Sequence, residues 1–157
     1  MKPIALISLL AASIATPAIL TPAAFAAADP IYTGLFSNTA VQGHDVVAYF
    51  TEGRPVEGSR AFTTEYQGAE FRFVSQQNLD TFLAEPEAYA PQYGGYCANQ
   101  MSLGNLSDID PHVWLIHEGK LYLFGHDVGR DRWEKEGIDA MIKEANRHWR
   151  KRLAGSS

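Results

Sequence analysis

The sequence predicts a single compact domain of the α+β class, in which two antiparallel β-hairpins pack against about three short helices. Short apolar runs flank two-residue turns at Gln67-Gly68 and Glu118-Gly119, a pattern that is typical of hairpins. Segments with apolar residues three and four positions apart follow these runs, as amphipathic helices require. We find no internal repeat, low-complexity tract or linker after the first residues, so the pattern indicates one domain.

The first half of the chain is predicted to hold a strand and a hairpin. The apolar run 46–50 is followed by turn residues and predicts a strand. Residues 62–66 and 69–74 predict the two strands of the first hairpin. Because side chains alternate along a strand, Phe71 and Phe73 should share one face of the second strand.

A helix should follow this hairpin. Ser75 is a good N-cap residue, and the helix it begins would carry Leu79, Phe82 and Leu83 on one side. Pro86 should end that helix or start another turn.

The second half repeats the same kinds of element. Residues 113–116 and 121–124 predict a second hairpin. Asp127 should cap a helix that runs through Trp133, and Gly137 should break it. The last helix should then carry its apolar residues on one face: Ile138, Met141, Ile142, Ala145 and Trp149.

The first residues predict export. Lys2 precedes an apolar stretch that is too short to span a bilayer, and Ala24-Phe25-Ala26 is a pattern that signal peptidase accepts. We therefore expect a signal peptide at 1–26, a mature N-terminal segment at 27–40 and the domain itself at 41–153. A cut after Ala28 would serve as well, and an uncleaved anchor is the alternative. The mature protein should be periplasmic or secreted.

Composition excludes several classes of function. The chain has 13 Lys and Arg against 18 Asp and Glu, with a net charge of −5, so nucleic acid is not expected as a partner. Stable membrane insertion is not expected in the mature chain either, because no later stretch approaches membrane length. The sequence has no nucleotide-binding motif and no C-x-x-C-H haem motif. A basic run, Arg147, Arg150, Lys151 and Arg152, fits the end of a helix whose dipole favours cations.

Several stretches resemble the YHS-domain family. Residues 43–50, 66–73 and 78–89 carry the resemblance, and 93–98 and 119–123 are similar to the family's exported bacterial branch. The resemblance implies a small metal-sensing or metal-trafficking module related to TRASH domains. The resemblance runs from about Val41 to Trp149, within the domain expected at residues 41–153.

The resemblance does not supply the family's metal ligands. YHS domains carry cysteines at positions that correspond here to Ala48, Val74 and Asn78, and none of these is a thiol. The resemblance therefore carries over the scaffold but not the shared metal site.

Cys97 is the only cysteine in the chain, so it has no partner for an internal disulfide. It follows Gly94-Gly95, which allows a tight loop, and Met101 lies close to it in sequence. His44 and His126 stand at the ends of predicted elements, where ligands from different segments often meet. Cysteine with Met and His suits copper, while Cys with His suits zinc. We therefore expect a copper site, or alternatively a zinc site, made by Cys97, His126, His44 and Met101.

Two other functions remain open from the sequence. Cys97 could serve a thiol-based enzyme or redox protein that uses a histidine base, although the sequence favours a role other than catalysis. Alternatively, the protein could be a small-molecule or partner-binding module in which Cys97 is buried and inert. A buried Cys97 far from every histidine would favour the last function. The sequence leaves the oligomeric state open.

Overall fold

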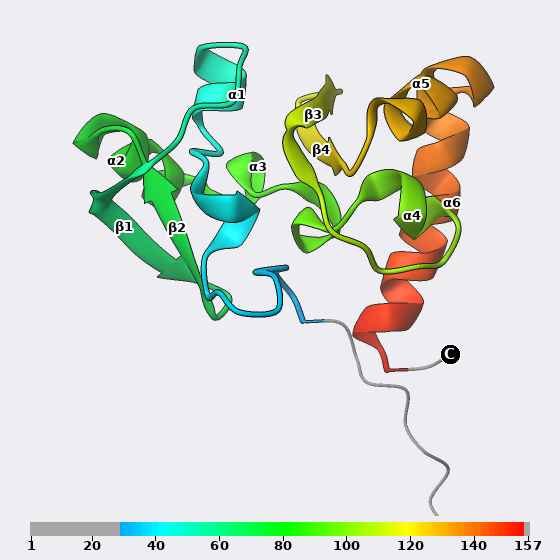
Figure 1. Cartoon of the computed structure of the whole chain (residues 1–157), viewed down its shortest axis with the longest axis horizontal. Helices are drawn as coiled ribbons and strands as arrows, with labels where there is room; N and C mark the ends of the chain where they lie inside the picture. Colours follow the sequence, from blue (N-terminus) through cyan, green and yellow to red (C-terminus); the bar gives the residue numbers. More distant parts are fainter. Residues whose placement is uncertain (1–28, 156–157) are drawn as a thin grey trace, which may run out of the picture.

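Two β-hairpins, each followed by helices, organise the chain (Figure 1). The structure, a computed structural model, describes residues 29–155, so the predicted signal peptide lies outside the described residues. No helix within 29–155 is long and apolar enough to cross a membrane. The elements in order, with short 3₁₀ helices marked η, are η1 Ala40–Gly43, α1 Ala48–Thr51, β1 Ser59–Tyr66, β2 Ala69–Phe73, α2 Gln76–Ala84, α3 Pro86–Tyr89, η2 Gln92–Gly95, α4 Ala98–Ser102, β3 Asp110–His117, β4 Lys120–Phe124, α5 Asp127–Glu136 and α6 Ile138–Leu153.

The α+β prediction and both predicted hairpins are confirmed. β1 pairs antiparallel with β2, and β3 pairs antiparallel with β4. The turn residues Gln67-Gly68 and Glu118-Gly119 all have positive φ, which matches the twist of a two-residue hairpin turn. Phe71 and Phe73 are both buried on the same face of β2.

The predicted strand at 46–50 is wrong, because residues 48–51 form helix α1. Asp45 explains the difference: its buried carboxylate accepts hydrogen bonds from the backbone N–H groups of Val47 at 2.8 Å and Ala48 at 3.3 Å. This contact caps a helical turn at its start. Residues 46–49 are all buried. The run therefore shows no alternation of apolar and polar residues that could distinguish a helix from a strand.

The helix after the first hairpin begins as predicted. The Ser75 hydroxyl accepts a hydrogen bond from the Asn78 N–H at 3.2 Å, and Pro86 starts α3. Leu79 and Phe82 are buried, but the prediction that Leu83 shares their side is wrong, since Leu83 is 55% exposed.

The two helices predicted after the second hairpin are present, but the residue predicted to cap the first of them does not do so. Asp127 does not cap α5 through its side chain; it is the first helical residue and pairs with Arg130 at 2.9 Å. Gly137 ends α5 with a φ of 99°, as its freedom at positive φ allows. In α6 the predicted apolar face packs on the core, with Ala145 fully buried.

The structure contains an internal repeat that we did not find in the sequence. A 3₁₀ helix, a short helix, a hairpin and a longer helix occur in this order twice. We call residues 40–89 the first unit and residues 92–153 the second unit. Figure 1 shows the first hairpin and its helix on the left and the second hairpin with α4, α5 and α6 on the right.

The two hairpins have the same register. Thr64 lies opposite Phe71, and Leu115, at the same spacing along the chain, lies opposite Tyr122. Each hairpin also has a register shift at the matching place, between Ser59 and Thr63 in one and between Asp110 and Trp114 in the other. The two units therefore share one supersecondary plan rather than a chance order of elements.

The two units also share a core. Phe71, Phe73 and Phe82 of the first unit pack in a cluster that includes Leu121 and Leu123 of β4. Cys97 belongs to the same cluster. A second cluster lies within the second unit, around the buried Trp133. The site near Cys97 is consequently held by packing from both units.

Candidate functional site

Cys97 sits where the tight loop after η2 enters α4. Its side chain is 4% exposed, and its backbone N–H donates to the carbonyl oxygen of Ser107 at 3.0 Å. Its Sγ accepts a hydrogen bond from the backbone N–H of Gly125 at 3.3 Å. Gly94 and Gly95 both adopt positive φ, as the predicted loop requires. The thiol is thus fixed between two loops rather than displayed on the surface.

A cavity of about 520 Å³ opens beside this thiol. It lies between the start of α4, the loop before β3 and the start of α5. Cys97 and His126 both line it, so the structure brings these two predicted ligands together. The other lining residues are Asn99, Gln100, Ser107, Asp108, Ile109, Gly125, Val128 and Gly129.

The other two predicted ligands do not line this cavity. Met101 is fully buried in the second core cluster. The His44 Nδ1 lies 3.3 Å from the carbonyl oxygen of Val41, and the His44 ring packs edge-on against His112 with centroids 5.7 Å apart. Among residues 29–155, no three His, Cys, Asp or Glu side chains are grouped so that they could hold a metal ion.

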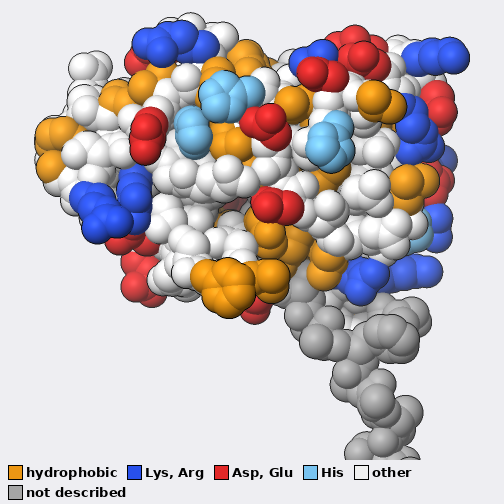
Figure 2. Space-filling view, viewed as in Figure 1, with side chains coloured by type: hydrophobic (Ala, Val, Ile, Leu, Met, Phe, Trp, Pro, Cys, Tyr) orange, Lys and Arg blue, Asp and Glu red, His pale blue; other side chains and the backbone are white. Residues whose placement is uncertain are grey.

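The remaining histidines pair with local carboxylates or basic residues. The His112 N–H and imidazole both bond to Asp110, and these contacts hold the pKa of Asp110 below its usual range. His117 contacts Asp139 at 2.7 Å, and burial beside Arg147 lowers the pKa of His148. Figure 2 shows histidine side chains gathered on the upper part of one face, with acidic side chains between them.

The repeat gives the position of Cys97 a counterpart in the first unit. The Asp45 N–H donates to the Val56 carbonyl at 2.9 Å, as the Cys97 N–H donates to Ser107. Asp45 Oδ2 accepts from the Val74 N–H at 2.9 Å, as Cys97 Sγ accepts from Gly125. The thiol of the second unit therefore occupies the place that a buried carboxylate holds in the first unit.

The two places differ in what surrounds them. In the first unit the Asn78 side chain fills the space and donates to Asp45 Oδ2 at 2.7 Å. The residue at the matching position of α5 is Gly129, which has no side chain and lines the cavity. The first unit thus has a closed polar network, whereas in the second unit the Asn99 side chain packs against Gly129 and the buried thiol lines a cavity.

Comparison with known families finds one match. Residues 47–93 match the family model described as the YHS domain. The match covers most of the first unit and ends before Cys97. A search of the curated proteins and a search of the solved structures found nothing that matches the chain.

Proposed function

The chain belongs to the YHS-domain family, and we propose that it is an exported protein that binds copper(I) as cargo through Cys97 and His126. The observation that carries the proposal is the placement of the chain's only thiol and an imidazole on the wall of one cavity. The role is metal handling rather than catalysis.

The chemistry of the pair suits copper(I). A thiolate is a soft ligand that selects this ion over harder cations, and imidazole binds copper well. Copper(I) accepts low coordination numbers, so a cysteine and a histidine can hold it without a third protein ligand. The hydrogen bond from the Gly125 N–H to Sγ would hold the sulfur in place at the cavity wall.

The internal repeat also supports a metal site at Cys97. The family resemblance puts its cysteines at Ala48, Val74 and Asn78, which lie around Asp45 in the first unit. The second-unit positions matching Val74 and Asn78 are Gly125 and Gly129, and both line the Cys97 cavity. The second unit therefore places a thiol beside a cavity at a position where the first unit has a closed network of hydrogen bonds.

A competition titration of the reduced protein with copper(I), against a coloured chelator, tests the proposal. We expect Cys97→Ser to weaken copper(I) binding on the order of a hundredfold or more, and His126→Gln about tenfold. His112→Gln is the matched control, because His112 is exposed and does not line the cavity. Equal binding by wild type and Cys97→Ser would contradict the proposal.

Alkylation of Cys97 separates copper handling from the two other functions considered. Bound copper(I) should slow alkylation, and removal of the metal by chelator should restore it. A thiol enzyme would instead react quickly whether or not copper is present. An inert buried thiol would react slowly in both conditions. If zinc slowed the alkylation of Cys97 and copper(I) did not, the bound ion would be zinc rather than copper.

A further inference from the structure

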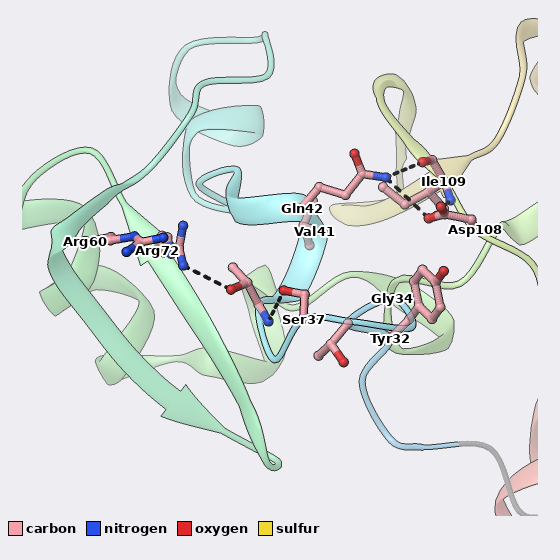
Figure 3. A pocket seen from close by; sticks show the side chains of 11 residues that line it. Tyr32, Gly34, Ser37, Val41, Gln42, Arg60, Arg72, Asp108 and Ile109 are labelled. Carbon is pink, nitrogen blue, oxygen red and sulfur yellow. Dashed lines mark hydrogen bonds between the residues drawn. The ribbon is translucent and has the colours of Figure 1, made fainter.

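A second cavity, of about 420 Å³, lies where the mature N-terminal segment crosses between the two units. Its size falls within the range of small-molecule sites. One wall comes from residues 32–39, another from η1 and the first hairpin, and the third from Asp108 and Ile109. Figure 3 shows Arg60 and Arg72 together on one side of it, and Tyr32, Gln42 and Asp108 on the opposite side.

The hairpin side of this cavity carries a net positive charge. Arg72 donates through Nε to Glu70 Oε1 at 2.7 Å and through Nη2 to the Thr39 hydroxyl at 3.1 Å, so its guanidinium is held in place. Glu70 offsets one of the two arginines and does not line the cavity. Arg60 has no ion-pair partner among the described residues, which leaves about one positive charge at this side to be met by a ligand.

The opposite side carries a negative charge. Asp108 makes no ion pair within the described part of the chain, and its Oδ1 accepts from the Gln42 side-chain amide at 3.3 Å. Gln42 also donates to the Ile109 carbonyl at 2.7 Å, which fixes the position of this side relative to η1. Burial and the nearby Asp108 raise the pKa of Tyr32, so its hydroxyl stays protonated.

Hydrogen bonds and packing hold the segment at residues 32–39 in place. The Tyr32 N–H donates to the Gly94 carbonyl at 2.8 Å, and the Tyr32 ring packs against Tyr96 with centroids 4.8 Å apart. The Glu70 N–H of the first hairpin donates to the Asn38 carbonyl at 2.7 Å. The segment that closes the cavity is therefore tied to both units.

We propose that this cavity binds a small zwitterion, with a carboxylate at Arg60 and Arg72 and an ammonium group at Asp108. A guanidinium matches a carboxylate through paired hydrogen bonds. The single net positive charge on this side neutralises one carboxylate, but it would leave a phosphate dianion with an unbalanced negative charge. Asp108 repels a second anion and attracts an ammonium group, so the two sides together select against both dicarboxylates and diamines.

Calorimetry with matched probes tests this proposal. The probes are unbranched amino acids from glycine to aminohexanoic acid, together with a dicarboxylate and a diamine of the same length as the amino acid that binds best. We expect the amino acid to bind at millimolar concentration or below and about tenfold more tightly than either matched probe, which corresponds to about 1.4 kcal/mol. Equal binding of the three probes, or no saturable binding of any amino acid at millimolar concentration, would overturn the proposal.

Two variants test which side chain binds the carboxylate of the ligand and which binds its ammonium group. Arg60→Gln should weaken amino-acid binding about tenfold, while Arg54→Gln, the same charge change on an exposed arginine outside the cavity, should leave it unchanged. Asp108→Asn should remove the preference for the amino acid over the dicarboxylate. Equal effects of Arg60→Gln and Arg54→Gln would contradict the assignment. Because Arg60 does not line the Cys97 cavity, the Arg60→Gln variant should bind copper(I) as tightly as the wild-type protein does.

Discussion

At the scale of single residues, Asp45 is a buried carboxylate that joins three segments of the first unit. It is fully buried and accepts hydrogen bonds from the N–H groups of Val47, Ala48 and Val74 and from the Asn78 side chain. Asp45→Asn would turn an amide NH₂ toward these donors, so we expect it to lower the free energy of unfolding by about 3 kcal/mol or more. Urea denaturation measures the loss.

The control for this prediction lies on the exposed side of α2. Asp80 accepts a hydrogen bond from Gln76 at 2.8 Å at the surface, and an asparagine there keeps an acceptor oxygen. Asp80→Asn should change stability by less than about 0.5 kcal/mol. If Asp45→Asn were equally mild, the buried carboxylate would not organise α1 as described.

Of the four ligands predicted from the sequence, two line one cavity and two do not. Cys97 and His126 were singled out by residue type and by their position at element ends, and both line one cavity. Gly125 and Gly129 also line that cavity, and a Cβ added to Gly129 would lie 2.9 Å from the Asn99 side chain. Nothing in a single sequence marks a glycine as a residue of a cavity wall. Met101 and His44 have suitable side chains, but packing directs them elsewhere.

At the scale of elements, local signals predicted the hairpins because the turn residues impose positive φ. The Ser75 cap was predicted for a similar local reason. The helix at 48–51 was not predicted, since its cap comes from Asp45 and that carboxylate is held by Val74, directly after β2, and by Asn78 of α2, far along the chain. Contacts of this range leave no periodic signal in the sequence.

The loop before Cys97 gives a prediction about a single element. A Cβ added to Gly94 would clash with the backbone of Pro30 and Ile31, whereas a Cβ on Gly68 would meet nothing. Both glycines have positive φ, so the pair separates backbone strain from steric clash. We expect Gly68→Ala to cost about 1 kcal/mol and Gly94→Ala at least twice as much, measured by thermal unfolding. Equal costs would mean that residues 30–31 do not pack against η2.

At the scale of the whole molecule, the two units should unfold together. Leu121 and Leu123 of the second unit pack in the same cluster as Phe71 and Phe73 of the first. All three tryptophans, Trp114, Trp133 and Trp149, belong to the second unit. Trp114 also packs edge-on against Tyr49 of the first unit, with ring centroids 5.4 Å apart, so the fluorescence reports on the second unit and on its contact with the first. We expect fluorescence and far-ultraviolet circular dichroism to give coincident unfolding curves.

A variant in the first unit extends this test. Asp45→Asn should move the fluorescence midpoint by the same amount as the circular dichroism midpoint, even though no tryptophan lies in the first unit. Two separated transitions would show that the units are independent domains. The repeat itself escaped notice in the sequence because the units share register and turn geometry but few identical residues.

The central claim is that copper(I) binds between Cys97 and His126, and X-ray absorption at the copper edge of the loaded, reduced protein tests it most directly. We predict a first shell with sulfur and a nitrogen scatterer of the imidazole type in wild type. His126→Gln should lose the imidazole signature and keep the sulfur, while His112→Gln should match wild type. A wild-type spectrum without a sulfur scatterer would contradict the account.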